Sequence, residues 1–197
     1  MLPDQIKPKR HEAFSTLLMF LLAILIAFLL TAFIFQQYQV DGPSMQTSLY
    51  NQNRLIVVKY QRTWARITGH PYVPKRGDII IFNQGGLYNI NGLPEKILVK
   101  RVVGLPGDRV VVSNGILKIY NKQHPVGFDP DKTQSYGKVI GYTSGNIDIT
   151  LSKNYIYVMG DNRSDSLDSR VFGPVNTSQI IGKLVLRIYP FNTVKLF

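Results

Sequence analysis

A strongly apolar run without a charged residue, from Phe14 to Phe35, restricts the possible folds of this chain more than any other feature. As a helix the run is about 33 Å long and can cross a hydrocarbon core of about 30 Å. A cleavable signal peptide is the competing interpretation, but its apolar region covers only about 7 to 15 residues and ends in small residues. Here the bulky segment 33–38 ends the run. We therefore predict an uncleaved membrane anchor over residues 14–35.

Positive charge before the run predicts its orientation. Lys7, Lys9 and Arg10 precede it, and basic flanks remain on the cytoplasmic side. We therefore expect a single-pass protein of the cell membrane, with residues 1–13 in the cytoplasm and residues 36–197 outside it. The chain has a net charge of +11, and nearly all of that charge follows the run. This distribution predicts contact with anionic membrane lipids, and no nucleic-acid partner.

Beyond the anchor, short segments rich in β-branched and aromatic residues alternate with turn residues, a pattern typical of strands. The predicted strands are residues 55–58, 78–82, 97–103, 109–112, 116–120, 146–151, 155–159 and 184–189. Ser113-Asn114-Gly115 predicts a tight hairpin between two of them. The fold class is therefore mainly β: a transmembrane helix, then an all-β domain of coiled antiparallel sheets over residues 36–197, with a small β subdomain inserted at about 109–152.

The stretch from Tyr60 to Pro74 has two open interpretations. It contains Trp64 and Tyr72 together with arginines at positions 62 and 66. Aromatic and basic residues in combination are typical of a membrane interface. An ordinary hairpin with a packed tryptophan uses the same residue types.

Composition excludes several kinds of site. The chain has no cysteine, which excludes disulfides, thiolate nucleophiles and cysteine metal sites. His11, His70 and His124 do not have the spacing of metal ligands, so we predict no metal and no cofactor. A serine–histidine–aspartate triad stays open at this point, because triad members converge only in the fold.

Val40-Asp41-Gly42-Pro43-Ser44-Met45 places a serine on a Gly-Pro turn shortly after the anchor. A juxtamembrane turn without chemistry would use the same residues. An extended chain from Phe35 to Ser44 reaches no more than about 30 Å, so any reaction at Ser44 takes place close to the bilayer. Ser44 is our candidate nucleophile.

Lys100 is the candidate base. On its predicted strand Leu98 and Val102 share its face. A lysine at such a position usually reaches solvent, but a buried lysine loses proton affinity and can act as a general base. Serine–lysine pairs are a known variant of the serine nucleophile and its base.

The segment Gly160 to Arg170 follows an apolar strand and is almost entirely polar. It is either a solvated loop or an ion-paired network that orients a site.

Together these stretches resemble the bacterial type I signal peptidases in their short Gram-positive form. These are membrane-anchored Ser/Lys endopeptidases that remove signal peptides from exported preproteins. The resemblance covers most of the chain from Phe14 onward. It rests on four segments in this order: Gly42–Met45, Arg76–Phe82, Lys100–Asp108, and Gly160–Arg170 followed by Phe172-Gly173.

The resemblance implies a role for each matching residue. Ser44 is implied as the nucleophile, with its backbone N–H in the oxyanion hole, and Lys100 as the general base. Ser166 is implied as the hydroxyl that orients the lysine amine. The supporting pairs that it implies are Asp168 with Arg170 and Asp161 with Arg101.

The chain differs from the family pattern at two places near Ser44. The family reads Ser-Met-x-Pro-Thr where this chain has Gln46 and Thr47 after Ser44-Met45, and Gly42 stands where some members use a serine hydroxyl in the oxyanion hole.

Two other functions remain open. A non-catalytic, membrane-anchored signal-peptide-binding homologue would keep the same fold. A basic, tethered adhesion or envelope-binding domain would leave Ser44 and Lys100 unexplained together.

Overall fold

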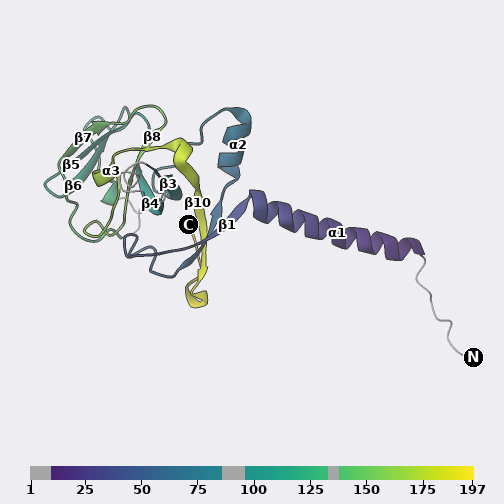
Figure 1. Cartoon of the computed structure of the whole chain (residues 1–197). Coiled ribbons are helices and arrows are strands. Elements are labelled where there is room, and N and C mark those ends of the chain that lie inside the picture. The colour runs from purple at the N-terminus through teal and green to yellow at the C-terminus, as the bar shows by residue number, and fades with distance from the viewer. Residues whose placement is uncertain (1–9, 86–95, 133–137) are drawn as a thin grey trace, which may run out of the picture.

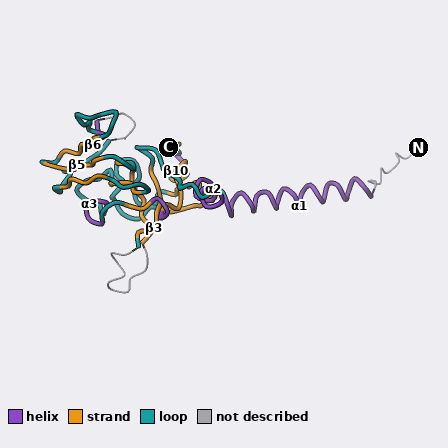
Figure 2. The backbone as a smooth tube through the Cα atoms, turned by 90° about the horizontal axis from the view of Figure 1, so that it is seen from above, coloured by secondary structure: helices purple, strands orange, loops and turns teal. Residues whose placement is uncertain are grey.

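The computed structural model describes residues 10–85, 96–132 and 138–197. Its N-terminal helix α1 (Arg10–Phe33) projects from a β-rich body, and this projection is visible from two directions (Figures 1 and 2). Among the described residues α1 is the one helix that is long and apolar enough to cross a membrane, over Glu12–Phe33. The predicted apolar helix is confirmed. It ends two residues before Phe35, because β1 begins there.

One antiparallel sheet organises the body, in the strand order β1-β2-β10-β3-β4-β8-β9. Strand β11 pairs with β10 outside this path. The bounds are β1 (Phe35–Gln39), β2 (Arg54–Val58), β3 (Ile79–Gln84), β4 (Lys96–Gly104), β8 (Tyr155–Met159), β9 (Val175–Asn176), β10 (Ile180–Tyr189) and β11 (Lys195–Leu196). These strands confirm the prediction of coiled antiparallel sheets.

The centre of this sheet is buried on both faces. In β3, Ile79 and Ile81 belong to one apolar cluster, whereas Ile80 and Phe82 belong to another. Successive side chains of a strand point to opposite faces, so the continuous apolar run of β3 supplies both clusters. The neighbouring strand β4, which carries Lys100, therefore crosses the interior of the body.

A second, three-stranded sheet has the order β6-β5-β7. Its strands are β5 (Arg109–Ser113), β6 (Ile116–Tyr120) and β7 (Ile147–Thr150). Asn114 and Gly115 form the β5–β6 turn with φ angles of 52° and 80°, so the predicted hairpin is confirmed. Val110 and Leu117 of this sheet share a core cluster with Val103 and Tyr157 of the large sheet.

Two helices interrupt the predicted run of strands: α2 (Tyr60–Thr68) and α3 (Ser169–Phe172). Gly69 ends α2 in the left-handed region that favours glycine. Trp64 lies on α2 and is 66% exposed, so the interpretation of a hairpin with a packed tryptophan is wrong. Short 3-10 turns complete the described elements: η2 (Pro130–Lys132), η4 (Thr177–Gln179) and η5 (Phe191–Thr193).

We predict that Gly104→Ala destabilises the fold, because Gly104 is tightly packed where the two sheets contact each other. A Cβ there would lie 2.8 Å from Val110 Cγ2 and 2.9 Å from both Leu151 Cδ1 and Tyr157 Cβ. Overpacking of this kind costs about 1–3 kcal/mol. Urea unfolding in detergent measures the effect, with Val126→Ala at an exposed position as the control. Equal stability of the two variants would contradict the close packing.

Candidate active site

Ser44 lies in the loop of residues 40–53, between β1 and β2. Met45 and Leu49 on the same loop are fully buried in the apolar cluster that includes Ile79 and Ile81. Gly42 has a φ of 91°, which side chains other than glycine's rarely adopt, and it makes the turn before the serine. Burial on one side and the glycine turn on the other therefore set the position of Ser44.

The loop that follows β8 supports Ser44 through its backbone. The Asn162 N–H donates a 3.0 Å hydrogen bond to Ser44 O. A Cβ added to Gly160 would come within 2.5 Å of Ser44 O and 2.6 Å of Ser166 Cβ. A side chain at position 160 would therefore push the two loops apart. The sequence alone had not indicated that Asn162 holds the backbone of Ser44.

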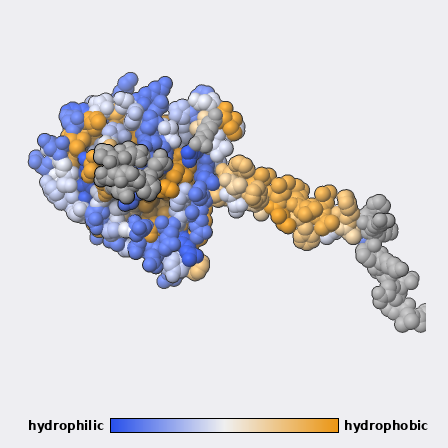
Figure 3. Space-filling model, viewed as in Figure 1, coloured by the Kyte–Doolittle hydropathy of each residue, from blue (hydrophilic) through white to orange (hydrophobic). Residues whose placement is uncertain are grey.

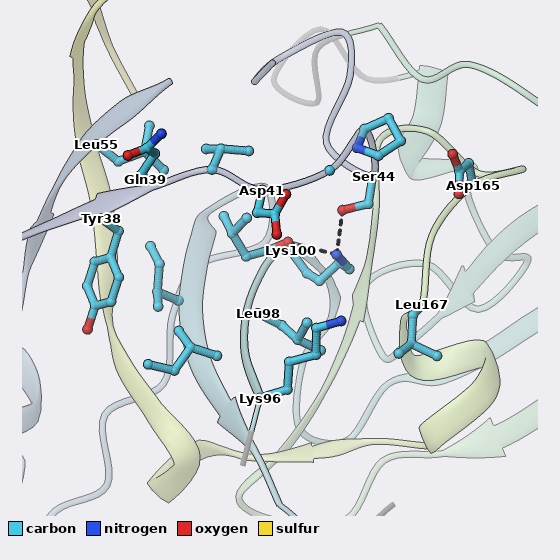
Figure 4. A pocket seen from close by; sticks show the side chains of 16 residues that line it. Tyr38, Gln39, Asp41, Ser44, Leu55, Lys96, Leu98, Lys100, Asp165 and Leu167 are labelled. Carbon is cyan, nitrogen blue, oxygen red and sulfur yellow. Dashed lines mark hydrogen bonds between the residues drawn. The ribbon is translucent and has the colours of Figure 1, made fainter. Parts of the chain in front are cut away.

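Lys100 reaches Ser44 from the middle of β4. Its Nζ lies 2.7 Å from Ser44 Oγ and donates a 3.0 Å hydrogen bond to Val99 O (Figure 4). The side chain is nearly buried, with an exposed fraction of 3%. The structure thus brings together two residues that lie on separate elements and were predicted as nucleophile and base.

Burial lowers the pKa of Lys100 from about 10.5 to about 8. The carboxylate of Asp168 opposes this shift, the ammonium of Lys96 reinforces it, and Asp161 opposes it. A substantial fraction of Lys100 is therefore neutral near pH 8. The neutral amine has the lone pair that a general base needs.

Asp168 and Arg170 form the predicted ion pair. Arg170 Nε and Nη2 each donate a 2.8 Å hydrogen bond to the carboxylate, which is fully buried. The Gly160 N–H adds a 3.0 Å bond. Burial alone would raise the pKa of Asp168, but the hydrogen bonds and charge of Arg170, together with the bond from Gly160 and the nearby Ser166 hydroxyl, outweigh it, and the pKa is lowered. The carboxylate near Lys100 therefore already has its own cation.

Asp161 is paired in the same way, with Arg101. Arg101 Nε and Nη2 lie 2.8 and 2.6 Å from the two carboxylate oxygens of Asp161, and both side chains are buried. The same guanidinium donates a 2.9 Å bond to Ser48 Oγ on the loop that carries Ser44. Because each nearby carboxylate is matched to an arginine, neither is left as a dedicated counter-ion for Lys100.

Ser166 lies on the loop after β8, close to Gly160 and Asp168. Its Oγ is buried and makes no hydrogen bond of normal geometry within the described residues. It lies close enough to Asp168 to contribute to the lowered pKa of that carboxylate. The acceptor for the lysine amine, besides Ser44 Oγ, is Val99 O. An orienting role for Ser166 thus stays a prediction.

A further ion pair, between a buried arginine and a partly buried aspartate, was not predicted. Arg163 is 2% exposed, contacts Asp131 with both terminal nitrogens, and donates a 3.1 Å bond to Gly160 O. Asp131 lies in a distant polar segment, so no local sequence signal joins the two residues. The pair adds to the support of the loop after β8.

A groove of about 270 Å³ opens at Ser44 and Lys100 (Figure 4). Residues 38–44 form one wall and residues 96–100 of β4 the other, with Asp165 and Leu167 at one end. Neither His70 nor His124 lines it, and both are exposed. No cluster of three acidic or histidine side chains suited to a metal occurs in residues 10–85, 96–132 and 138–197. The groove can hold a peptide segment against the serine–lysine pair.

Comparisons with known proteins cover nearly the whole chain. A family model described as "Signal peptidase, peptidase S26" matches residues 13–189. Signal peptidase I P of Bacillus subtilis subsp. natto is 31% identical over 195 residues, 98% of this chain and 97% of the relative. Signal peptidase I of Bacillus caldolyticus is 34% identical over 180 residues, 86% and 87% of the two chains. Signal peptidase I S of Bacillus subtilis strain 168 is 33% identical over 180 residues, 88% of each.

We predict that Lys100→Met stabilises the protein near neutral pH. With a folded pKa of about 8 against about 10.5, the charged lysine costs roughly 3 kcal/mol below pH 8. The cost decreases between pH 8 and 10.5, where the unfolded chain binds the proton and the folded chain does not. The advantage of the variant should therefore fade over this range.

Urea unfolding in detergent from pH 6 to 10.5 measures the difference in unfolding free energy between wild type and Lys100→Met. Lys118→Met, the same substitution at an exposed lysine on β6, is the control. A pH-independent difference for Lys100→Met would contradict the depressed pKa.

Proposed function

Because this chain belongs to the signal peptidase family, peptidase S26, we propose that Ser44 and Lys100 are the residues with which it cleaves its substrates. Family membership makes the protein a peptidase that removes signal peptides from preproteins, and with the apolar helix α1 it is membrane-anchored. The observation that supports the catalytic assignment is the 2.7 Å approach of a buried lysine amine to a serine hydroxyl.

The short distance between Lys100 Nζ and Ser44 Oγ allows the first half of the reaction, acylation of the serine. Neutral Lys100 Nζ accepts the proton of Ser44 Oγ as the oxygen attacks the carbonyl carbon of the scissile peptide bond. The tetrahedral intermediate then collapses, and the protonated amine gives its proton to the leaving nitrogen. The mature protein is released, and the signal peptide remains as an ester on Ser44.

Deacylation uses the same lysine. Lys100 accepts a proton from a water molecule, which attacks the ester carbonyl, and the proton then returns to Ser44 Oγ. The oxyanion formed in each half needs donors aimed at it. We assign the Ser44 backbone N–H as one donor, since the Asn162 bond to Ser44 O and the buried Met45 hold this part of the backbone.

The other implied residues act by positioning in this proposal. The pair of Asp168 with Arg170 stabilises the loop after β8 internally. Arg101, which is paired with Asp161 of that loop, also bonds to Ser48 and so joins the loop to the one that carries Ser44. Ser166, which packs close to Gly160 and Asp168, is proposed to orient the lysine amine with its hydroxyl. Substrate selection is proposed to follow the family pattern, with small side chains at the first and third positions before the cut.

We also propose a location for each part of the chain. Residues 1–13 are cytoplasmic, residues 14–35 form the anchor, and residues 36–197 form the extracytoplasmic catalytic part with a smaller subdomain at about 109–152. The excess of basic residues after the anchor supports contact with anionic lipids.

We predict that Lys100→Arg folds but cleaves preproteins roughly 10³-fold more slowly or worse, because arginine keeps the charge and does not deprotonate. Ser44→Ala is the matched control and should be equally inactive. Wild-type activity should rise with pH through a limb near pH 8, as Lys100 deprotonates. Cleavage of a radiolabelled preprotein in detergent measures all three. Substantial activity of Lys100→Arg would remove Lys100 as the base.

We predict that a protease added to intact spheroplasts digests the β-rich body, because basic residues before α1 keep the N-terminus inside. Immunodetection of a tag at the C-terminus follows the digestion. Protection of the tag until the membrane is opened would reverse the proposed orientation, and a tagged cytoplasmic protein serves as the control for intact membranes.

A further inference from the structure

Helix α2 presents an apolar face that no part of the described structure covers. Tyr60, Trp64 and Ile67 are 53%, 66% and 72% exposed. They are spaced i, i+4 and i+7 and therefore share one side of the helix. Val73, 43% exposed, extends the surface beyond the helix. Three large apolar side chains on one short helix mark an interaction surface rather than ordinary scatter.

The position of α2 is tied to the end of the membrane helix. The Lys59 N–H donates a 2.8 Å hydrogen bond to Ile34 O, immediately after α1, and Lys59 Nζ donates a 3.1 Å bond to Ala32 O. The ammonium thus caps a carbonyl at the C-terminus of α1, where a cation is favoured and where a lysine at the edge of a bilayer reaches the headgroups. The first turn of α2 therefore starts at the level where α1 leaves the hydrocarbon.

The direction of α2 completes the geometry. In Figure 1 it runs across the direction of α1, and in Figure 2 it is seen nearly end-on while α1 still runs lengthwise. In Figure 3 hydrophobic atoms gather at α2 on the side from which α1 extends. Helix α2 thus lies beside the end of α1 and across its direction.

We propose that α2 is an interfacial helix, whose face of Tyr60, Trp64 and Ile67 is inserted into the bilayer surface next to α1. The polar layer on each side of the hydrocarbon is about 5–8 Å thick, comparable to the radius of a helix with its side chains. Because Lys59, immediately before α2, is hydrogen-bonded to Ile34 at the end of α1, and because α2 lies across α1, α2 falls within this layer. Tyr and Trp are the residues that favour this depth.

The second contact restrains the body. A single helix leaves the body free to turn about the axis of α1, whereas α1 and α2 together fix its rotation and the height of the groove above the bilayer. This consequence rests on the proposed function of Ser44 and Lys100. It means that α2 matters for precursors embedded in the membrane and not for short peptides in solution.

The chain offers a direct probe, because Trp64 is its only tryptophan. We would reconstitute the full-length protein in phosphatidylcholine–phosphatidylglycerol vesicles containing lipids brominated near the headgroup end of the acyl chain. We expect strong quenching of Trp64 fluorescence by bromine and weak quenching by aqueous acrylamide. The control is Trp64→Phe combined with Val126→Trp, at a site that is 84% exposed outside α2, and it should show the reverse.

Either of two results would overturn the interfacial position. Quenching of Trp64 that matches the control would leave the helix in water. Protection from both quenchers would mean that protein, such as a second copy of this chain, covers the face.

The functional consequence is tested separately with Ile67→Glu, and Val126→Glu is the matched control. We expect Ile67→Glu to cleave a vesicle-embedded precursor about tenfold more slowly and a short soluble peptide at the wild-type rate. If Ile67→Glu cleaved both substrates at the wild-type rate, or lost activity equally on both, the proposed restraint would be contradicted. A wild type that cleaves neither substrate would instead contradict the proposed function.

Discussion

The site depends on the burial of one cationic side chain. Lys100 lies on an interior strand, and the loss of hydration there, more than the positive charge of Lys96, lowers its proton affinity. Burial can keep the pKa of Lys100 low only if no nearby carboxylate stabilises the charged form of the amine. Asp168 and Asp161 are close enough to act, but each is bonded to an arginine, Arg170 and Arg101. The ion pairs that look like structural reinforcement therefore also allow the lysine to be neutral.

The nucleophile is held by constraints of a different kind. A serine on a surface turn would move too much to stay 2.7 Å from a fixed amine. Here Met45 anchors the loop in the core, and the Asn162 N–H holds the serine carbonyl. Gly160 provides the space in which that hydrogen bond can form. The two loops thus depend on each other and on the ends of β1 and β8, so the precision of the site comes from the sheet.

Much of the fold could be predicted because its signals are local. The apolar run, the alternating strands and the Asn114-Gly115 turn each lie within a few residues. The site depends on contacts between distant segments, and the approach of Lys100 to Ser44 was expected from family resemblance rather than from spacing. Neither spacing nor family resemblance predicted the ion pair of Arg163 and Asp131. Helix α2 was missed although Tyr60, Trp64 and Ile67 have helical spacing, because a helix so short is marginal without tertiary support.

The central claim is that burial lowers the pKa of the Lys100 amine from about 10.5 to about 8, so that much of it can act as a base. Its most direct test is NMR of the full-length protein in micelles, with lysine labelled at Cε and the Lys100 resonance assigned by its absence from Lys100→Arg. Titration should show a midpoint near 8 for Lys100, clearly below the exposed lysines of the same sample. A midpoint for Lys100 within the range of the exposed lysines would contradict the account.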